Sequence, residues 1–146
     1  MNILVSACLL GVSCRYDGES KGHPLAADLL QKYTAIPVCP EILGGLPTPR
    51  PPAERQGEGV FTGTGTDVTE AYRRGAQEVL RLARLYGCTT AILKERSPAC
   101  GAGEIYDGSF THTLTEGYGV AAELLQENGI RVLGESELED FLRGET

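Results

Sequence analysis

The stretch CTTAILKERSPACG, residues 88–101, joins an apolar run to a loop that carries a cysteine. Residues 88–93 are short, apolar and rich in β-branched side chains, which is typical of a buried strand. The chain then turns through charged residues and a proline to Cys100, which Gly101 follows. A strand that ends in a constrained cysteine indicates either a reactive thiol or a metal ligand.

Apolar patterns on both sides of this stretch predict alternating strands and helices. The expected strands span residues 2–7, 34–38, 88–93 and 130–134, and the expected helices span residues 25–33, 67–86, 118–128 and 136–142. This order predicts an α/β domain with a mostly parallel sheet. Pro37 lacks a backbone donor, so its strand is expected either to lie at an edge of the sheet or to end there. A glycine-rich segment, 101–117, carries no predicted element.

Local signals mark two helix starts and one long loop. Asp67 with Glu70, and Ser136 with Glu139, have the spacing of a capping box. Residues 40–57 hold most of the prolines and are predicted to form a stiff, irregular loop. Long loops in compact domains are often functional.

Length and charge exclude several classes of protein. A chain of 146 residues with 41% hydrophobic residues fits one domain, residues 1–146. Its net charge of −7 argues against a nucleic-acid surface, which needs many Lys and Arg side chains. No apolar stretch approaches the roughly 20 residues of a membrane helix. The N-terminus lacks the basic and long apolar regions of a signal peptide, so a cytoplasmic protein is expected.

The cysteines favour metal binding or thiol chemistry. The chain has 5 of them, an odd number, and a reducing compartment disfavours a disulfide framework. Cys8, Cys39 and Cys100 each follow a predicted strand, and the carboxyl ends of parallel strands meet at one edge of a sheet. Cys88 begins its strand at the opposite edge and is expected in the core. Cys14 lies in the loop after Cys8, as a ligand, a resolving thiol or a packed neighbour.

Three convergent thiolates suit either zinc or an iron–sulfur cluster. His23 and His112 have no metal-like spacing. Glu41 lies two residues after Cys39, and Ser97 lies three residues before Cys100. A carboxylate and a hydroxyl beside thiolates are suited to acid–base catalysis. Glu41 or Ser97 alone would be interpreted as an ordinary loop residue. The position of both beside cysteines favours a catalytic role instead.

Four segments together resemble one known family. They are SACLLG (6–11), CRYDG (14–18), VCPE with GGLPTPRPPAE (38–54) and KERSPACGAGEIYDG (94–108). In this order they resemble the thiouracil desulfidase (TudS-like) family over nearly the whole chain. Ala99 is a departure, because relatives often have serine there.

The resemblance implies a Rossmann-like α/β fold with its site at the carboxyl ends of the strands. It implies a [4Fe-4S] cluster held by Cys8, Cys39 and Cys100, with one open iron position. It also implies that Glu41 and Ser97 are catalytic. The implied reaction is non-redox: sulfur leaves a thiolated pyrimidine such as 2-thiouracil, which gives uracil and hydrogen sulfide. The implied partner is therefore a small molecule.

Other interpretations of the same residues stay open. A protein that binds or carries sulfur or a cluster, without turning over thiouracil, would need the same thiols. A redox protein using Cys8 and Cys14 is disfavoured because they do not form a C-x-x-C pair. Loop position alone adds four candidate substrate contacts, which are Arg15, Tyr16, Arg50 and Lys94.

Overall fold

A four-stranded sheet forms the centre of the protein, whose computed structural model describes residues 1–144. The strand order is β2-β1-β5-β8, and every pairing in this sheet is parallel. The strands are β1 (Asn2–Ser6), β2 (Thr34–Val38), β5 (Thr90–Leu93) and β8 (Arg131–Gly134). The predicted α/β fold with a mostly parallel sheet is confirmed, and β2 lies at an edge, as Pro37 predicts.

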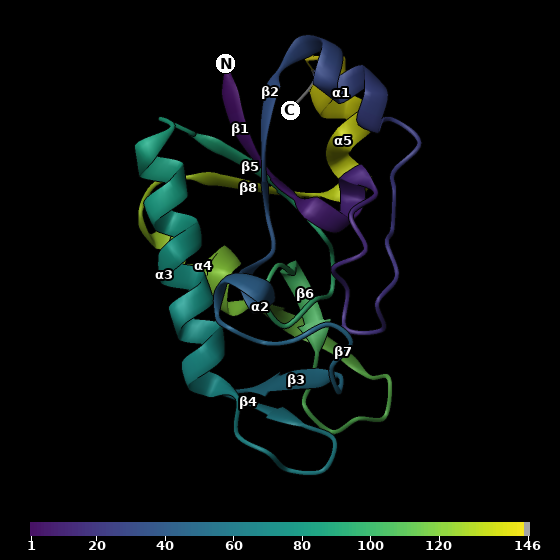
Figure 1. Ribbon diagram of the computed structural model, residues 1–146, viewed down its shortest axis with the longest axis vertical. Coiled ribbons are helices and arrows are strands. Elements are labelled where there is room, and N and C mark those ends of the chain that lie inside the picture. Colours follow the sequence, from purple (N-terminus) through teal and green to yellow (C-terminus); the bar gives the residue numbers. More distant parts are fainter. Residues whose placement is uncertain (145–146) are drawn as a thin grey trace.

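Helices cover both faces of this sheet (Figure 1). They are α3 (Thr69–Leu85) and α4 (Val120–Glu127) on one face, and α1 (Ala26–Lys32) and α5 (Leu138–Leu142) on the other. Because successive strand residues point to opposite faces, Leu4 packs with α3 and α4, whereas Ile3 and Val5 pack with α1 and α5. Among residues 1–144, no helix is long and apolar enough to span a bilayer.

Two antiparallel hairpins and a short helix lie beyond the carboxyl ends of the central strands (Figure 1). They are α2 (Pro40–Leu43), β3 (Ala53–Gln56) with β4 (Gly59–Thr62), and β6 (Ala102–Tyr106) with β7 (Leu114–Tyr118). The irregular loop predicted for 40–57 is therefore partly wrong, and 101–117 contains strands that the pattern does not predict. Segments such as AERQ and AGE have weak strand propensity, so their pairing depends on the partner strand.

The predicted capping box of α3 is also wrong. Asp67 accepts a hydrogen bond from the backbone N–H of Thr69 at 2.9 Å, but the N-cap is Val68 and Glu70 takes no part in a cap. The Asp67 bond is an Asx turn, which shapes the chain just before the helix.

Ser136 does not cap the last helix either. Its hydroxyl donates to the carboxylate of Glu95, and residues Glu135–Glu137 form a 3₁₀ turn before α5. Glu137 accepts a hydrogen bond from the backbone N–H of Gly134 at 3.0 Å. The segment after β8 is therefore tied to the loop after β5, close to the candidate site.

Candidate metal and catalytic site

Three cysteines converge where the central strands end. Cys8 lies in the 3₁₀ turn Ala7–Leu10 after β1, Cys39 directly follows β2, and Cys100 follows the loop after β5. Burial raises the pKa of the Cys100 thiol, and the neighbouring Cys39 and Cys8 raise it further. Burial and Cys39 likewise raise the pKa of Cys8. The structure thus brings together the three thiols that the strand pattern predicts to meet, and all three are free.

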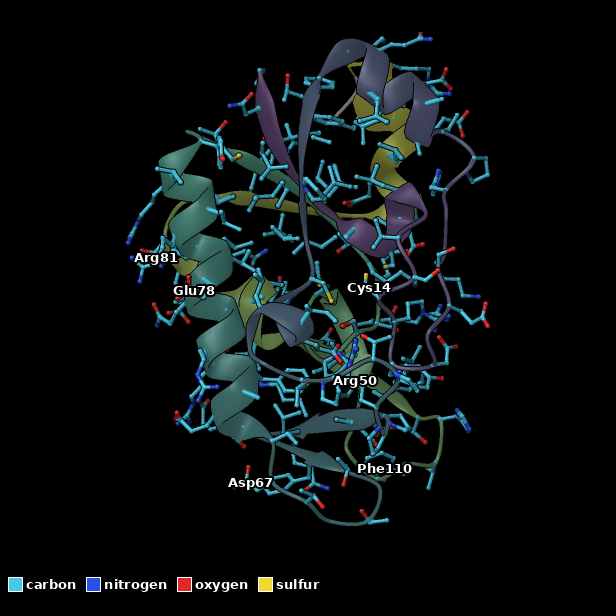
Figure 2. The ribbon with its side chains drawn as sticks, in the orientation of Figure 1. Cys14, Arg50, Asp67, Glu78, Arg81 and Phe110 are labelled. Carbon is cyan, nitrogen blue, oxygen red and sulfur yellow. The ribbon has the colours of Figure 1, made fainter. Side chains whose placement is uncertain are left out.

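A fourth thiol, Cys14, is close enough to Cys39 and Cys8 for both to raise its pKa. Figure 2 shows it near Arg50, which donates to its backbone carbonyl. The Cys39 thiol donates to the backbone carbonyl of Cys14 at 3.8 Å. Burial, with Cys39 and Cys8 nearby, raises the pKa of Cys14 to about 12. Cys88 stands apart, because burial alone raises its pKa and it packs in the core beside α3 and α4. Its predicted place in the core is confirmed.

Ser6, at the buried end of β1, supports the thiol group and was not among the predicted site residues. Its hydroxyl oxygen accepts a hydrogen bond from the backbone N–H of Lys94 at 2.8 Å. The same hydroxyl lies beside Cys100 and lowers the pKa of that thiol, opposing burial. In the sequence the signal is a serine at the end of an apolar run. In the structure this polar residue is only 2% exposed.

Lys94 lies beside Cys8 and next to Glu135. After burial, which raises the pKa of Cys8, the Lys94 ammonium is the largest influence and lowers it. The Lys94 Nζ atom is 2.8 Å from Glu135 Oε1, in a half-buried ion pair. Its charge is therefore placed to stabilise a thiolate at Cys8.

Ser97 shapes the loop that carries Cys100. Its hydroxyl oxygen accepts hydrogen bonds from the backbone N–H groups of Ala99 at 3.0 Å and Cys100 at 3.1 Å. The N-terminus of α4 holds the same loop, since the N–H of Val120 donates to the carbonyl of Pro98 at 2.9 Å. The turn-forming role of Ser97 is thus visible, and its O–H proton is left to donate to another group.

Glu41 is held by Arg50. The Arg50 Nε atom is 2.8 Å from Glu41 Oε1, and the side chains are 4% and 15% exposed. Burial would lower the pKa of Arg50, but the Glu41 carboxylate more than offsets this, so the pKa is raised. The other Arg50 contacts are to the carbonyls of Pro47 and Cys14 and the hydroxyl of Thr48. Arg50, a predicted substrate contact, is therefore engaged by protein acceptors.

Arg15 and Tyr16 flank this group on the loop after Cys14. Arg15 helps to lower the pKa of Cys8, although less than Lys94 does. Its guanidinium lies 5.5 Å from the centre of the Tyr16 ring, and the Tyr16 carbonyl accepts from the backbone N–H of Arg50 at 2.7 Å. Both residues border the group of cysteines, and their contact with a substrate stays a prediction.

Comparison with known proteins assigns the chain to a family. A family model described as 2-thiouracil desulfurase matches residues 3–137. The chain belongs to the 2-thiouracil desulfurase family. It is 45% identical over 150 residues to the uncharacterized protein YbbK of Bacillus subtilis (strain 168), with 96% of this chain and 99% of that protein covered.

A solved structure shares both the sequence and the fold of this member of the 2-thiouracil desulfurase family. It is described as the [4Fe-4S]-dependent thiouracil desulfidase TudS. It is 48% identical, with a TM-score of 0.92, and the match covers 98% of this chain and 96% of that one. The family resemblance of the four sequence segments is confirmed. The roles of the individual site residues stay predictions.

Proposed function

We propose that this protein is a [4Fe-4S]-dependent, non-redox desulfidase that converts thiolated pyrimidines such as 2-thiouracil to uracil and hydrogen sulfide. The observation that carries the proposal is the convergence of three strand-end thiols, with Glu41 close enough to Cys100 to raise its thiol pKa. The 48% identity to a structure described as a thiouracil desulfidase, over nearly the whole length of this chain, supports the same activity.

The donor set fits an iron–sulfur cluster better than a single ion. Within residues 1–144, no three His, Cys, Asp or Glu side chains are close enough to share one metal ion. In a cluster each cysteine binds a different iron atom, so wider spacing is expected. Lys94, Arg15 and the Ser6 hydroxyl all lower the pKa of a neighbouring cysteine, which favours the thiolate form that ligation requires. Cys8, Cys39 and Cys100 would hold the cluster.

The reaction needs one water and no electron. When bound, the cluster supplies a Lewis-acidic iron at its open position, which polarises the carbon–sulfur bond. The Glu41 carboxylate takes a proton from the water that attacks the ring carbon. Ser97 donates a hydrogen bond that orients the substrate or supplies a proton to it. The carbon–oxygen bond forms, the carbon–sulfur bond breaks, and the sulfur leaves with two protons as hydrogen sulfide.

The proposed substrate is a small molecule, and the proposed location of the protein is the cytoplasm. The net charge of −7 disfavours a nucleic-acid substrate such as thiolated tRNA. The free thiols of the site suit a reducing compartment. Arg15 and Tyr16 border the site and are the proposed substrate contacts. Lys94 would join them if it left Glu135, and Arg50 would do so through a nitrogen other than the Nε that holds Glu41.

The test is sulfide release by the reconstituted protein. Protein loaded with iron and sulfide without air, then freed of excess reagents, is incubated with 2-thiouracil. We expect uracil and hydrogen sulfide in equal amounts, over many turnovers per protein and with no added reductant. A stable cluster without sulfide release would contradict the desulfidase proposal and favour a cluster carrier. Turnover by protein without iron would contradict the cofactor.

Replacement of Ser6 by alanine should weaken the hold on the cluster without removing a ligand. Loss of the hydroxyl beside Cys100 leaves that thiolate less stabilised, so we expect a ferrous chelator to remove iron roughly tenfold faster. Ser6→Thr keeps the hydroxyl and should stay close to the wild-type rate. Ser13→Ala, at an exposed serine, is the control. Equal rates for the wild type and Ser6→Ala would disprove this support role.

A further inference from the structure

We infer that Tyr72, on α3, is a positioning residue for the Glu41 carboxylate, and that the close contact of α2 with α3 sets where this carboxylate lies. The inference rests on the proposed function, because it gives Glu41 its catalytic meaning. Tyr72 is 2% exposed and packs in the core cluster, closed off from solvent. It therefore acts through Glu41.

The backbones of α2 and α3 touch because two glycines allow it. A Cβ atom on Gly75 would lie 1.8 Å from the carbonyl oxygen of Pro40, and one on Gly44 would lie 2.0 Å from the carbonyl oxygen of Ala71. Neither distance leaves room for a side chain, and the atoms that would clash are backbone. Pro40, the residue before Glu41, therefore packs directly against the backbone of α3. This contact fixes the distance between the first turn of α2 and α3.

Tyr72 occupies the same face of α3 as Gly75, three residues away. Its hydroxyl lies near the Glu41 carboxylate, which after burial is the largest cause of the raised pKa of this phenol. A phenol O–H at this position is placed to donate a hydrogen bond to the carboxylate. Because Tyr72 is buried in a helix that packs on the sheet, its position is fixed by the core.

Glu41 is thereby held from two sides. The Tyr72 hydroxyl lies near it on α3, and Arg50 Nε, in the loop after α2, donates to it at 2.8 Å. Arg50 is itself tied to the carbonyl of Cys14 at 2.8 Å, so the carboxylate is linked to the thiol group through rigid contacts. A base must lie within hydrogen-bond reach of the proton it removes, and a displacement of about 1 Å can cost a hundredfold in rate. Two fixed donors prevent such a displacement.

Tyr72→Phe removes only the hydroxyl and tests the catalytic consequence. In the loaded protein we expect kcat for sulfide release to fall roughly tenfold, with KM and iron content unchanged. Tyr86→Phe, at the end of the same helix where the ring is 46% exposed, is the matched control and should change neither constant. A kcat equal to that of the wild type would overturn the inference, and so would a change confined to KM or to iron content.

A double-mutant cycle in the cluster-free protein tests the contact without any activity. Tyr72→Phe should lower Tm in the wild-type background, because it removes the hydroxyl that lies near Glu41. In a Glu41→Ala background the buried hydroxyl has lost this partner, so the same change should leave Tm unchanged or raise it. Equal losses of Tm in both backgrounds would overturn the contact. Loaded wild-type protein that releases no sulfide would instead overturn the proposed function, and with it the catalytic consequence, while the cycle would still decide the contact.

Discussion

Glu41→Gln should leave the cluster in place and reduce sulfide release from 2-thiouracil at least a hundredfold. General-base catalysis contributes about 10² to 10⁴ in rate, and an amide takes up no proton at neutral pH. Glutamine has the shape of glutamate, and its carbonyl oxygen is placed to accept the Arg50 Nε bond seen at 2.8 Å. The loss would therefore report on proton transfer and not on the position of the side chain. The measurement is kcat per iron-loaded protein.

The charge of Glu41 also stabilises the fold through Arg50, and the experiment must separate this effect from the effect on catalysis. Arg50 has only 4% of its side chain exposed, and Glu41→Gln leaves its charge without a carboxylate. Removing one partner of a buried ion pair costs about 3–5 kcal/mol, so Tm should also fall. Iron content and circular dichroism show whether the variant is still folded and loaded at the assay temperature. Glu104→Gln, at an exposed carboxylate on β6, is the control for a lost negative charge.

A folded, loaded Glu41→Gln protein with activity within twofold of the wild type would exclude Glu41 as the base. Ser97 would then be the next candidate. Ser97→Ala is a harder variant to interpret, because the Ser97 oxygen also accepts the backbone N–H of Cys100 at 3.1 Å. A loss of activity in that variant has two possible causes, so Glu41 is the sharper test.

The convergence of the three cysteines could be predicted from sequence because it depends only on the order of the strands. Cys8, Cys39 and Cys100 follow three strands of one parallel sheet, and the carboxyl ends of such strands share an edge. That argument needs apolar runs and their boundaries, which are local signals. The same logic placed Cys88 at the other end of β5, and the structure agrees.

The partners of Glu41 could not be predicted because they depend on packing. In the sequence, Tyr72 is one position in the apolar stripe of a predicted helix. No neighbouring residue in the sequence shows that its hydroxyl lies near Glu41. Arg50 lies in a proline-rich loop, where position alone pointed to substrate. The structure shows four hydrogen bonds from Arg50 to Glu41, Pro47, Thr48 and Cys14. Contacts of this kind form only once the tertiary structure has brought the loops together.

The hairpins beyond the sheet were missed for a related reason. Gly103 and Gly117 face each other in the β6–β7 pair, although glycine is a poor strand former. Phe110 and His112 in the connecting loop adopt positive φ angles, which local propensity does not favour. The loop is held by Glu54, which accepts from the backbone N–H groups of Gly108 and Phe110 at 3.0 and 3.1 Å.

Cys100→Ala should abolish cluster binding, and with it all sulfide release. The proposed ligand set has three thiolates, so one replacement removes a third of the protein's bonds to iron and leaves two irons without a protein ligand. Cys100 is 5% exposed, and a water molecule from bulk solvent does not reach its position freely. We expect less than a tenth of the wild-type iron and acid-labile sulfide per protein after reconstitution, and no visible absorption from a cluster.

Stability gives a second measure of the same loss. A group that binds only the folded protein raises its stability by an amount that grows with affinity and concentration. Reconstitution should therefore raise the Tm of the wild type and leave the Tm of Cys100→Ala unchanged. The substitution itself costs little, about 1 kcal/mol for a small buried side chain, so the cluster-free forms should unfold at similar temperatures. A full cluster in Cys100→Ala would remove this residue from the ligand set.

Two matched variants make the result specific. Cys88→Ala replaces another buried cysteine near the opposite end of β5, and it should keep its cluster and its activity. Cys14→Ala separates the three-ligand assignment from its nearest alternative, because Cys14 lies beside Cys8 and Cys39. If the ligands are Cys8, Cys39 and Cys100, Cys14→Ala keeps its iron. If Cys14→Ala loses iron and Cys8→Ala retains it, the first ligand is Cys14. The position of a cysteine at a strand end would then identify the ligands after β2 and β5 but not the ligand after β1.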